Sequence, residues 1–162
     1  MQKNIRRLPV LICVFAIAVI AIGCNDSTTE IGETPAFLLS AGDVAHIVTM
    51  EDLLTIGAVD VSSSPRDVLR NFTGVPLASI LYHFGVDYSS ANAVVFQALD
   101  GFMSEVSIAE ALDYANTFIV FEEDGQPLGT YEEDGQGPFM AVIALDQFPN
   151  RWARHLTAVT LQ

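Results

Sequence analysis

The sequence predicts an α+β domain built of compact mixed or antiparallel sheets and short helices. Many short apolar runs are separated by turn residues, a pattern typical of strands. Three other stretches show helical spacing of apolar residues or begin with helix-capping residues. Because these helices and strands do not alternate regularly along the chain, the pattern indicates the α+β class.

Residues 1–23 have the pattern of a signal peptide. Basic residues between Lys3 and Arg7 precede an apolar run, Leu8 to Ile22, that is marginal in length for a membrane span. The following stretch, Ala21 to Cys24, resembles a bacterial lipobox, although Ala stands where Leu is usual. We therefore expect Cys24 to be lipidated and the protein to be extracytoplasmic and anchored to the cell membrane. An uncleaved anchor helix is the alternative.

Residues 24–35 are rich in Ser, Thr and Glu and are expected to form a flexible spacer. Residues 36–162 are long enough for one domain with its own core. Without residues 1–23 the chain keeps four arginines, no lysine and all 20 acidic residues, a formal charge of 4 − 20 = −16. So acidic a chain is a poor partner for nucleic acid or an anionic lipid surface.

The folded part of the chain contains no thiol. Cys13 belongs to the signal peptide and Cys24 is the expected lipidation site. A disulfide, a thiolate metal site and a cysteine nucleophile are therefore excluded there.

The first half of the domain is predicted to hold three strands and two helices. Strands are expected at 36–39, 46–49 and 58–62, the first at a sheet edge. Thr49, with Asp52 three residues later, predicts a helix N-terminus and a short helix over 51–55. Residues 63–72 are expected to be a polar loop. A second helix begins at Leu77 and ends at Gly85, because its apolar residues recur on one face.

The second half is predicted to begin with a hairpin. Asp100-Gly101 separates apolar runs at 94–99 and 102–106, a strong hairpin signal. Ser107 with Glu110 predicts a capped helix over 107–114. Further strands are expected at 117–121, 139–145 and 156–161. Because the run 139–145 is wholly apolar, it is expected to be buried on both faces.

Two other patterns carry less functional weight. The acidic turn Glu122 to Gln126 recurs at Glu132 to Gln136, but the calcium-loop signature is missing, so solvated turns are favoured over a metal site. The three histidines, His46, His83 and His155, lack metal-ligand spacing. No Gly-x-Ser-x-Gly elbow is present, so enzyme motifs are absent.

The least expected local feature is the lone tryptophan, Trp152, beside Arg151 and near Arg154. An aromatic face with guanidinium groups is suited to a planar ligand that is hydrogen-bonding or anionic. The alternative is a tryptophan packed in the core with solvated arginines.

Several motifs occur in one order. They are Met50 to Leu53, the run Phe72 to Leu77 that contains Gly-Val-Pro-Leu, the turn Asp100 to Phe102, the turn Asp124 to Leu128, and Arg151-Trp152 before the last strand. In this order, over Thr49 to Leu161, the chain resembles the sulfite-oxidase-type molybdopterin-binding domain family. The resemblance implies a compact α+β fold with mixed sheets and a pterin pocket formed by loops.

The chain departs from this family at one decisive place. The catalytic members hold molybdenum through a cysteine before the Gly-Val-Pro-Leu helix, but the interval Val59 to Phe72 contains none. The hydroxyls of Ser62, Ser63 and Ser64 would be weak substitutes, because they must lose a proton of very high pKa. We therefore expect no molybdenum and lean against enzymatic activity.

The resemblance also extends to small metal-free members that bind a reduced pterin and report it to a membrane partner. It implies that Trp152 stacks on the ring while Arg151 or Arg154 binds the ring carbonyl. Asp100 would accept from the 2-amino group. The remaining site residues are walls at Phe102 and Phe139 and a close backbone approach at Gly137. Asp100 is otherwise a turn residue, and the two phenylalanines are otherwise core.

Three functions follow. The first is an exported, lipid-anchored domain that binds a pterin, a molybdopterin or a similar small flat ligand without a metal, together with a membrane-bound partner protein. The second is a molybdopterin-dependent oxidoreductase with a metal ligand other than cysteine. The third is a structural surface module that has lost the pocket.

Overall fold

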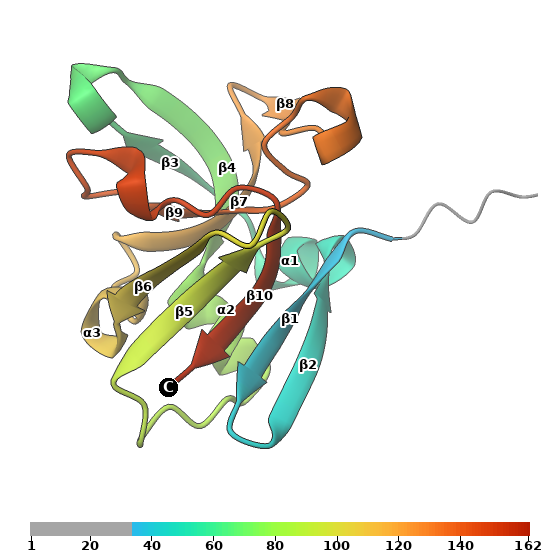
Figure 1. Cartoon of the computed structure of the whole chain (residues 1–162), viewed down its shortest axis with the longest axis vertical. Helices are drawn as coiled ribbons and strands as arrows, with labels where there is room; N and C mark the ends of the chain where they lie inside the picture. Colours follow the sequence, from blue (N-terminus) through green and yellow to red (C-terminus); the bar gives the residue numbers. More distant parts are fainter. Residues whose placement is uncertain (1–33) are drawn as a thin grey trace, which may run out of the picture. The chain divides into compact units, whose positions relative to one another are not determined.

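The structure, a computed structural model, describes residues 34–162 (Figure 1). The predicted signal peptide, Cys24 and most of the predicted spacer lie outside the described residues. None of the helices formed within 34–162 has the length and apolar character needed to cross a membrane.

One sheet is mixed and has five strands in the order β2-β1-β10-β5-β6. Its strands are β1 (Ala36–Ala41), β2 (Val44–Thr49), β5 (Ala93–Ala98), β6 (Met103–Ser107) and β10 (Leu156–Leu161). β1 and β10 are parallel, whereas the other pairs are antiparallel. The prediction that the first strand lies at an edge is wrong, because β1 is covered by β2 on one side and β10 on the other.

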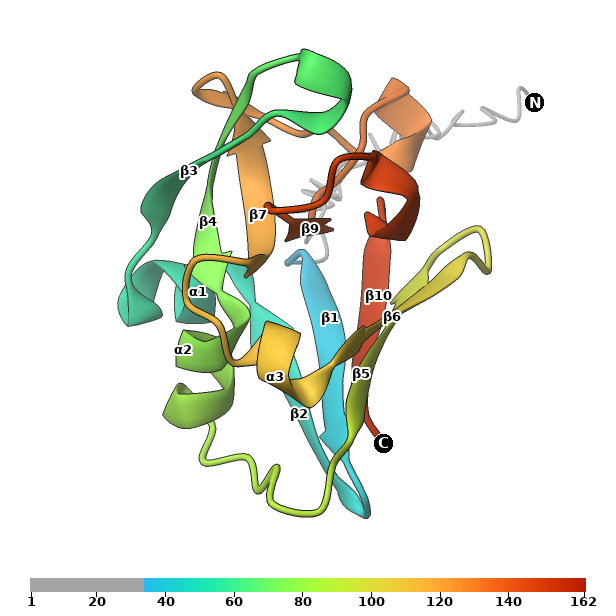
Figure 2. The same cartoon turned by 90° about the vertical axis from the view of Figure 1, so that its left-hand side faces the viewer.

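The second sheet is antiparallel. Its strands are β3 (Val59–Ser63), β4 (Arg70–Pro76), β7 (Thr117–Glu123), β8 (Gln126–Pro127) and β9 (Met140–Ile143). β7 pairs with β4 along one edge and with both β8 and β9 along the other. The two sheets confirm the predicted mixed and antiparallel α+β class, and Figure 2 shows them meeting near β9 and β10.

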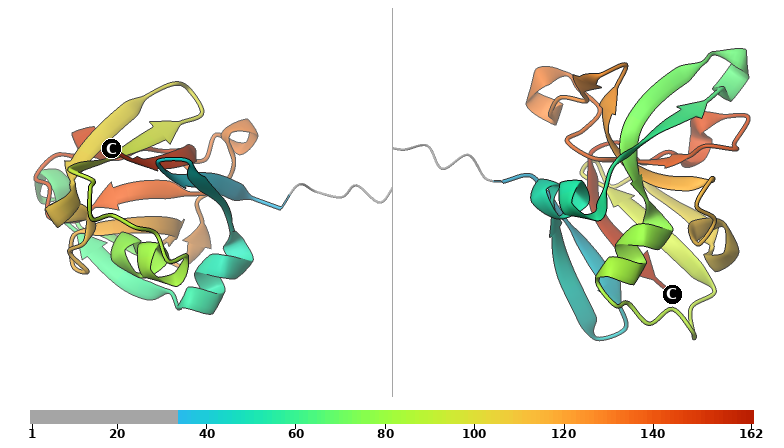
Figure 3. Two further views of the ribbon diagram at one scale, coloured as in Figure 1. Left: turned by 90° about the horizontal axis from the view of Figure 1, so that it is seen from below. Right: turned by 180° about the vertical axis from the view of Figure 1, so that it is seen from behind.

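The predicted polar loop 63–72 is wrong over its last part. Only the short turn η1 (Pro65–Asp67) and its neighbours leave the sheet, and β4 begins at Arg70. The sequence does not predict this strand, because Gly74 and Pro76 both weaken a strand pattern. Seen from behind, β4 runs directly into the second helix (Figure 3).

The helices are α1 (Met50–Ile56), α2 (Leu77–His83) and α3 (Ile108–Ala111). The predicted caps are confirmed: Thr49 Oγ1 accepts from the Asp52 N–H at 3.3 Å, and Ser107 Oγ accepts from the Glu110 N–H at 3.3 Å. α3 is shorter than the predicted 107–114, because an Asp113 side chain turns the chain by accepting from the N–H of Ala115.

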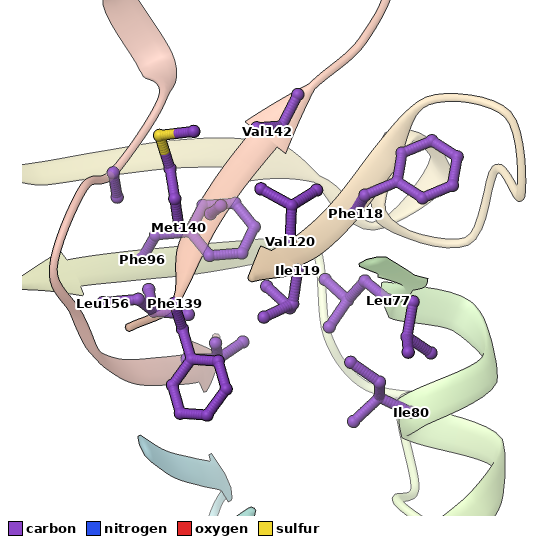
Figure 4. Close-up of a cluster of buried hydrophobic side chains, with 14 of the residues drawn as sticks. Leu77, Ile80, Phe96, Phe118, Ile119, Val120, Phe139, Met140, Val142 and Leu156 are labelled. Carbon is purple, nitrogen blue, oxygen red and sulfur yellow. The ribbon is translucent and has the colours of Figure 1, made fainter. Parts of the chain in front are cut away.

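The core contains buried side chains of both sheets and of α2 (Figure 4). Leu77 and Ile80 of α2 are fully buried with Ile119 of β7. Burying side chains of this size contributes about 1.5–3 kcal/mol each. β9 is buried along its whole length, which confirms the prediction for this run, but Leu145 beyond it is exposed.

Gly74 provides a test of how closely β4 approaches β7. A Cβ there would lie 2.5 Å from the Ile119 carbonyl oxygen and 2.7 Å from Val120 Cα, and neither backbone atom can rotate away. Gly74→Ala should therefore lower the free energy of unfolding by about 2–3 kcal/mol, measured by urea denaturation. The matched control is Gly42→Ala, which has open space and only left-handed backbone strain of about 1 kcal/mol. Equal losses in the two variants would contradict the close approach.

Candidate functional site

A surface cavity of about 200 Å³ lies between the β5–β6 turn and η3 (Pro149–Arg151). Its lining residues are Ala98, Asp100, Phe102, Pro149, Asn150, Trp152 and Arg154. Four of them are among the seven ligand-binding residues predicted from the sequence. The cavity therefore brings together two chain segments about fifty residues apart.

Two hydrogen bonds hold the walls of the cavity together. The N–H of Leu99 donates to the carbonyl of His155 over 2.9 Å. The hydroxyl of Ser104 donates to the carbonyl of Arg151 over 2.7 Å. Because each bond joins the hairpin to the chain around Trp152, the cavity has a fixed frame.

Trp152 is mainly a core residue. Only 5% of it is exposed, and its indole N–H donates to the Ile143 carbonyl over 3.1 Å. Phe72 packs edge-on against the ring, with centroids 5.5 Å apart, and the Arg70 guanidinium carbon lies 5.3 Å from the ring centroid. The expected stacking platform does not fit this environment, since little of the ring face remains free.

Phe102 is the aromatic side chain that the cavity exposes, with 40% of its surface accessible. The predicted Asp-Gly turn sets its position: Asp100 Oδ1 accepts from the N–H of Phe102 over 2.9 Å, and Gly101 has a φ of 85°. A side chain other than Gly is strained at that φ, so the turn depends on the glycine.

Arg154 supplies the cation of the cavity. Within residues 34–162 it has no carboxylate at ion-pair distance, and its side chain is exposed. The next residue, His155, holds a left-handed φ of 50°, which is uncommon for a residue other than glycine. His155 is fixed there by a bond from its N–H to the Gln136 carbonyl over 2.9 Å and by a contact of its Nδ1 with the Gly137 carbonyl at 2.8 Å.

Arg151 serves a different purpose from Arg154. Its guanidinium binds Asp146 through two hydrogen bonds of 2.6 and 2.9 Å, and Glu110 through one of 2.9 Å. These carboxylates raise the pKa of Arg151 above its already high ordinary value, Asp146 contributing most. Arg151 therefore ties η3 to α3 instead of lining the cavity.

Two further predicted residues, Phe139 and Gly137, do not reach the cavity. Phe139 is fully buried and packs edge-on against Phe37, with centroids 5.4 Å apart. A Cβ on Gly137 would lie 2.7 Å from Leu128 Cβ, so this glycine is required by packing against the neighbouring loop. Both are core positions. For Phe139 a core position is the alternative that the sequence predicts.

Sequence reasoning missed Asn150 and the support behind Trp152. Asn150 precedes Arg151 in a turn, and nothing in the sequence distinguishes it from an ordinary turn residue. Arg70 forms two hydrogen bonds of 2.6 Å with Glu123, and Gln136 adds a third bond to this carboxylate at 3.2 Å. The Arg70 bonds are the main cause of the lowered pKa of Glu123. No local pattern links residues so distant in sequence.

The residues around the expected metal position do not fit a molybdenum centre. Residues 34–162 contain no cysteine. Ser63 is buried and donates its hydroxyl to the Ala144 carbonyl over 2.7 Å, while Ser62 donates to Asn71 over 2.9 Å. In this part of the chain no three His, Cys, Asp or Glu side chains gather closely enough to hold a metal ion.

Comparison with known proteins gives one family and a distant structural likeness. The model of the oxidoreductase molybdopterin binding domain matches residues 65–162. No curated protein matches the sequence. The crystal structure of the sulfane dehydrogenase SoxCD from Paracoccus pantotrophus is similar at a TM-score of 0.61 and 14% identity, over 78% of this chain and 37% of that one. The chain thus spans little more than a third of that protein, and the likeness confirms the predicted sulfite-oxidase-like fold.

The tie between Arg151 and Glu110 gives a pH-dependent prediction. Hydrogen bonds, first from Arg151 and then from Ser107, lower the pKa of Glu110 from 4.5 to about 2. A carboxyl with a depressed folded-state pKa stabilises the fold above its unfolded pKa and loses this effect as pH falls toward the folded value. Glu110→Gln, which keeps a capping side chain, should cost about 1 kcal/mol at pH 7, a small value because the pair is partly exposed.

The cost of Glu110→Gln should shrink as the pH falls from about 5 to about 2, followed by urea unfolding at each pH. Glu105→Gln is the matched control, since Glu105 lies on β6 and makes no side-chain hydrogen bond or ion pair within residues 34–162. A cost that stays constant over this range would show that the ion pair does not contribute as described.

Proposed function

The chain belongs to the oxidoreductase molybdopterin-binding domain family, and on this premise we propose that it is an exported, lipid-anchored protein that binds a pterin or a similar flat ligand without a cysteine-held metal. The observation that carries the proposal is the convergence of Asp100, Phe102, Trp152 and Arg154 on one cavity. These residues come from two segments, and each has a chemical type that a flat, hydrogen-bonding ring requires.

We assign a role to each of these side chains. Phe102 offers the exposed ring face for stacking, and Trp152 forms part of the apolar floor. Arg154 donates to a ring carbonyl, because its guanidinium has no carboxylate partner among the described residues. Asp100 uses Oδ1 in its turn and can accept from an amino group through Oδ2.

The size of the cavity favours a ring system over a whole molybdopterin. Its volume of about 200 Å³ is below the lower end of common ligand sites, about 300 Å³. Arg154 is the one cationic side chain in the lining, so a phosphate and a ring carbonyl would compete for it. A free pterin without a phosphate therefore suits the cavity better.

Export and anchoring rest on the N-terminal sequence. The basic start, the apolar run to Ile22 and Cys24 together support cleavage before Cys24 and lipidation of its side chain. Residues 25–162 contain no cysteine, so the domain can function outside the cytoplasm without forming a disulfide. A membrane-bound protein that receives the signal of ligand binding completes the proposal.

The test is a fluorescence titration of the full chain with reduced and oxidised pterins. Trp152 is the single tryptophan and lines the cavity, so ligand binding should quench its emission saturably. Phe102→Ala should weaken binding about tenfold through lost stacking, and Arg154→Gln by a similar factor through a lost charged hydrogen bond. Tyr82→Ala, on the exposed side of α2, is the control and should bind normally.

Two other outcomes would overturn the proposal. No response to any pterin, with molybdenum in the protein as isolated, would favour the oxidoreductase with a ligand other than cysteine. No response and no metal would favour a surface module without a working pocket. Trp152→Ala is unsuitable as a variant, because the ring is part of the core.

A further inference from the structure

Exposed apolar side chains occur on three loops, two of which line the cavity. The loops are residues 64–69, 99–102 and 144–155, and their large exposed apolar residues, here called the apolar rim, are Val68, Leu69, Leu99, Phe102, Leu145 and Phe148. The first and third loops are joined by a bond from the N–H of Arg66 to the Gln147 carbonyl over 2.8 Å. The second and third share the cavity between Phe102 and Pro149. The three loops are therefore joined to one another.

Charge is distributed very unevenly between these loops and the rest of the domain. Residues 1–33 hold Asp26, Glu30 and Glu33, which leaves 17 of the 20 acidic residues in 34–162. The three loops carry three of the four arginines of this part and only three of its 17 acidic residues, so they are formally neutral. The other described residues hold 14 acids and one arginine, a formal charge of −13. An acidic partner is repelled everywhere except at the loops.

Two of the three arginines on the loops have no carboxylate at ion-pair distance among residues 34–162. Arg151 is paired with Asp146 and Glu110, but Arg66 and Arg154 are not paired. Both side chains are exposed beside the apolar rim. Such a surface is complementary to a partner that presents apolar side chains together with carboxylates, because the carboxylates would pair with the guanidinium groups on contact.

The charge of the domain argues for a protein over an anionic bilayer as the occupant of the rim. Outside the three loops the described residues carry a formal charge of −13, so an extended anionic surface would be repelled by most of the domain. A short segment of a partner protein can contact the loops alone.

We propose that the apolar rim and Arg66, with Arg154 reserved for the ligand, form the docking surface for a protein partner whose contact segment presents apolar side chains and carboxylates. Phe102 and Leu69 provide apolar contact area, and Arg66, a residue type enriched among interface hot spots, selects the partner by charge. The docked segment covers the mouth of the cavity. Docking itself goes beyond ligand binding and does not depend on which ligand the cavity holds.

The experiment is photo-cross-linking in the cell envelope with the full chain. A photoreactive phenylalanine analogue replaces Phe148 or Leu69 on the rim, and, as controls, Leu54 of α1 or Tyr82 of α2, which are at least as exposed as Phe148. The expected result is an adduct with one and the same protein from both rim positions and not from the controls. The cross-linked peptide, identified by mass spectrometry, should contain apolar residues and at least one carboxylate.

Arg66→Glu provides the second arm, because Arg66 lies outside the cavity lining. This variant should reduce the rim adducts by about fivefold while pterin titration and the unfolding midpoint stay unchanged. Any of four results would overturn the proposal. They are unchanged adducts in Arg66→Glu, adducts with lipid or with a second copy of the chain, equal adducts at the control positions, and no adduct at the rim. If the unsubstituted chain binds no pterin, the proposed ligand is wrong, but the docking surface is not affected.

Discussion

The segment from β9 to β10 spans both sheets, and the arrangement of the whole domain depends on this crossing. β9 is hydrogen-bonded to β7 in one sheet, and β10 lies between β1 and β5 in the other. The residues between them are therefore fixed at both ends, and a bridge between Ala141 and Ala153 closes the segment on itself. Trp152 and Arg154 owe their positions to this double attachment more than to any local turn.

Local signals in the sequence predicted the local structure well. The caps at Thr49 and Ser107 and the Asp100-Gly101 turn each rest on contacts within three residues, so residue types suffice to find them. β4 was missed because its strand character comes from pairing with β3 and β7, not from its own sequence, which contains Gly74 and Pro76. The place of β1 inside its sheet depends on β10, more than a hundred residues later.

The site shows the same division between local and distant causes. Residue type suggested an aromatic ring and an arginine, and the cavity holds both. The accessible ring is Phe102, and the arginine without an ion pair among residues 34–162 is Arg154. Sequence could not separate Arg151 from Arg154, because Glu110, which helps to neutralise Arg151, comes from a distant helix. Burial of Trp152 depends likewise on Phe72 and Arg70 in β4, a strand that the residue pattern conceals.

The central position of β10 has a consequence for folding during synthesis. β10 follows every other strand in the chain, yet β1 and β5 can join one sheet only through it. During synthesis both strands must wait with open edges, which are templates for pairing with other chains. The large share of distant contacts also slows folding. A product that ends before Leu156 would leave β1 and β5 unjoined.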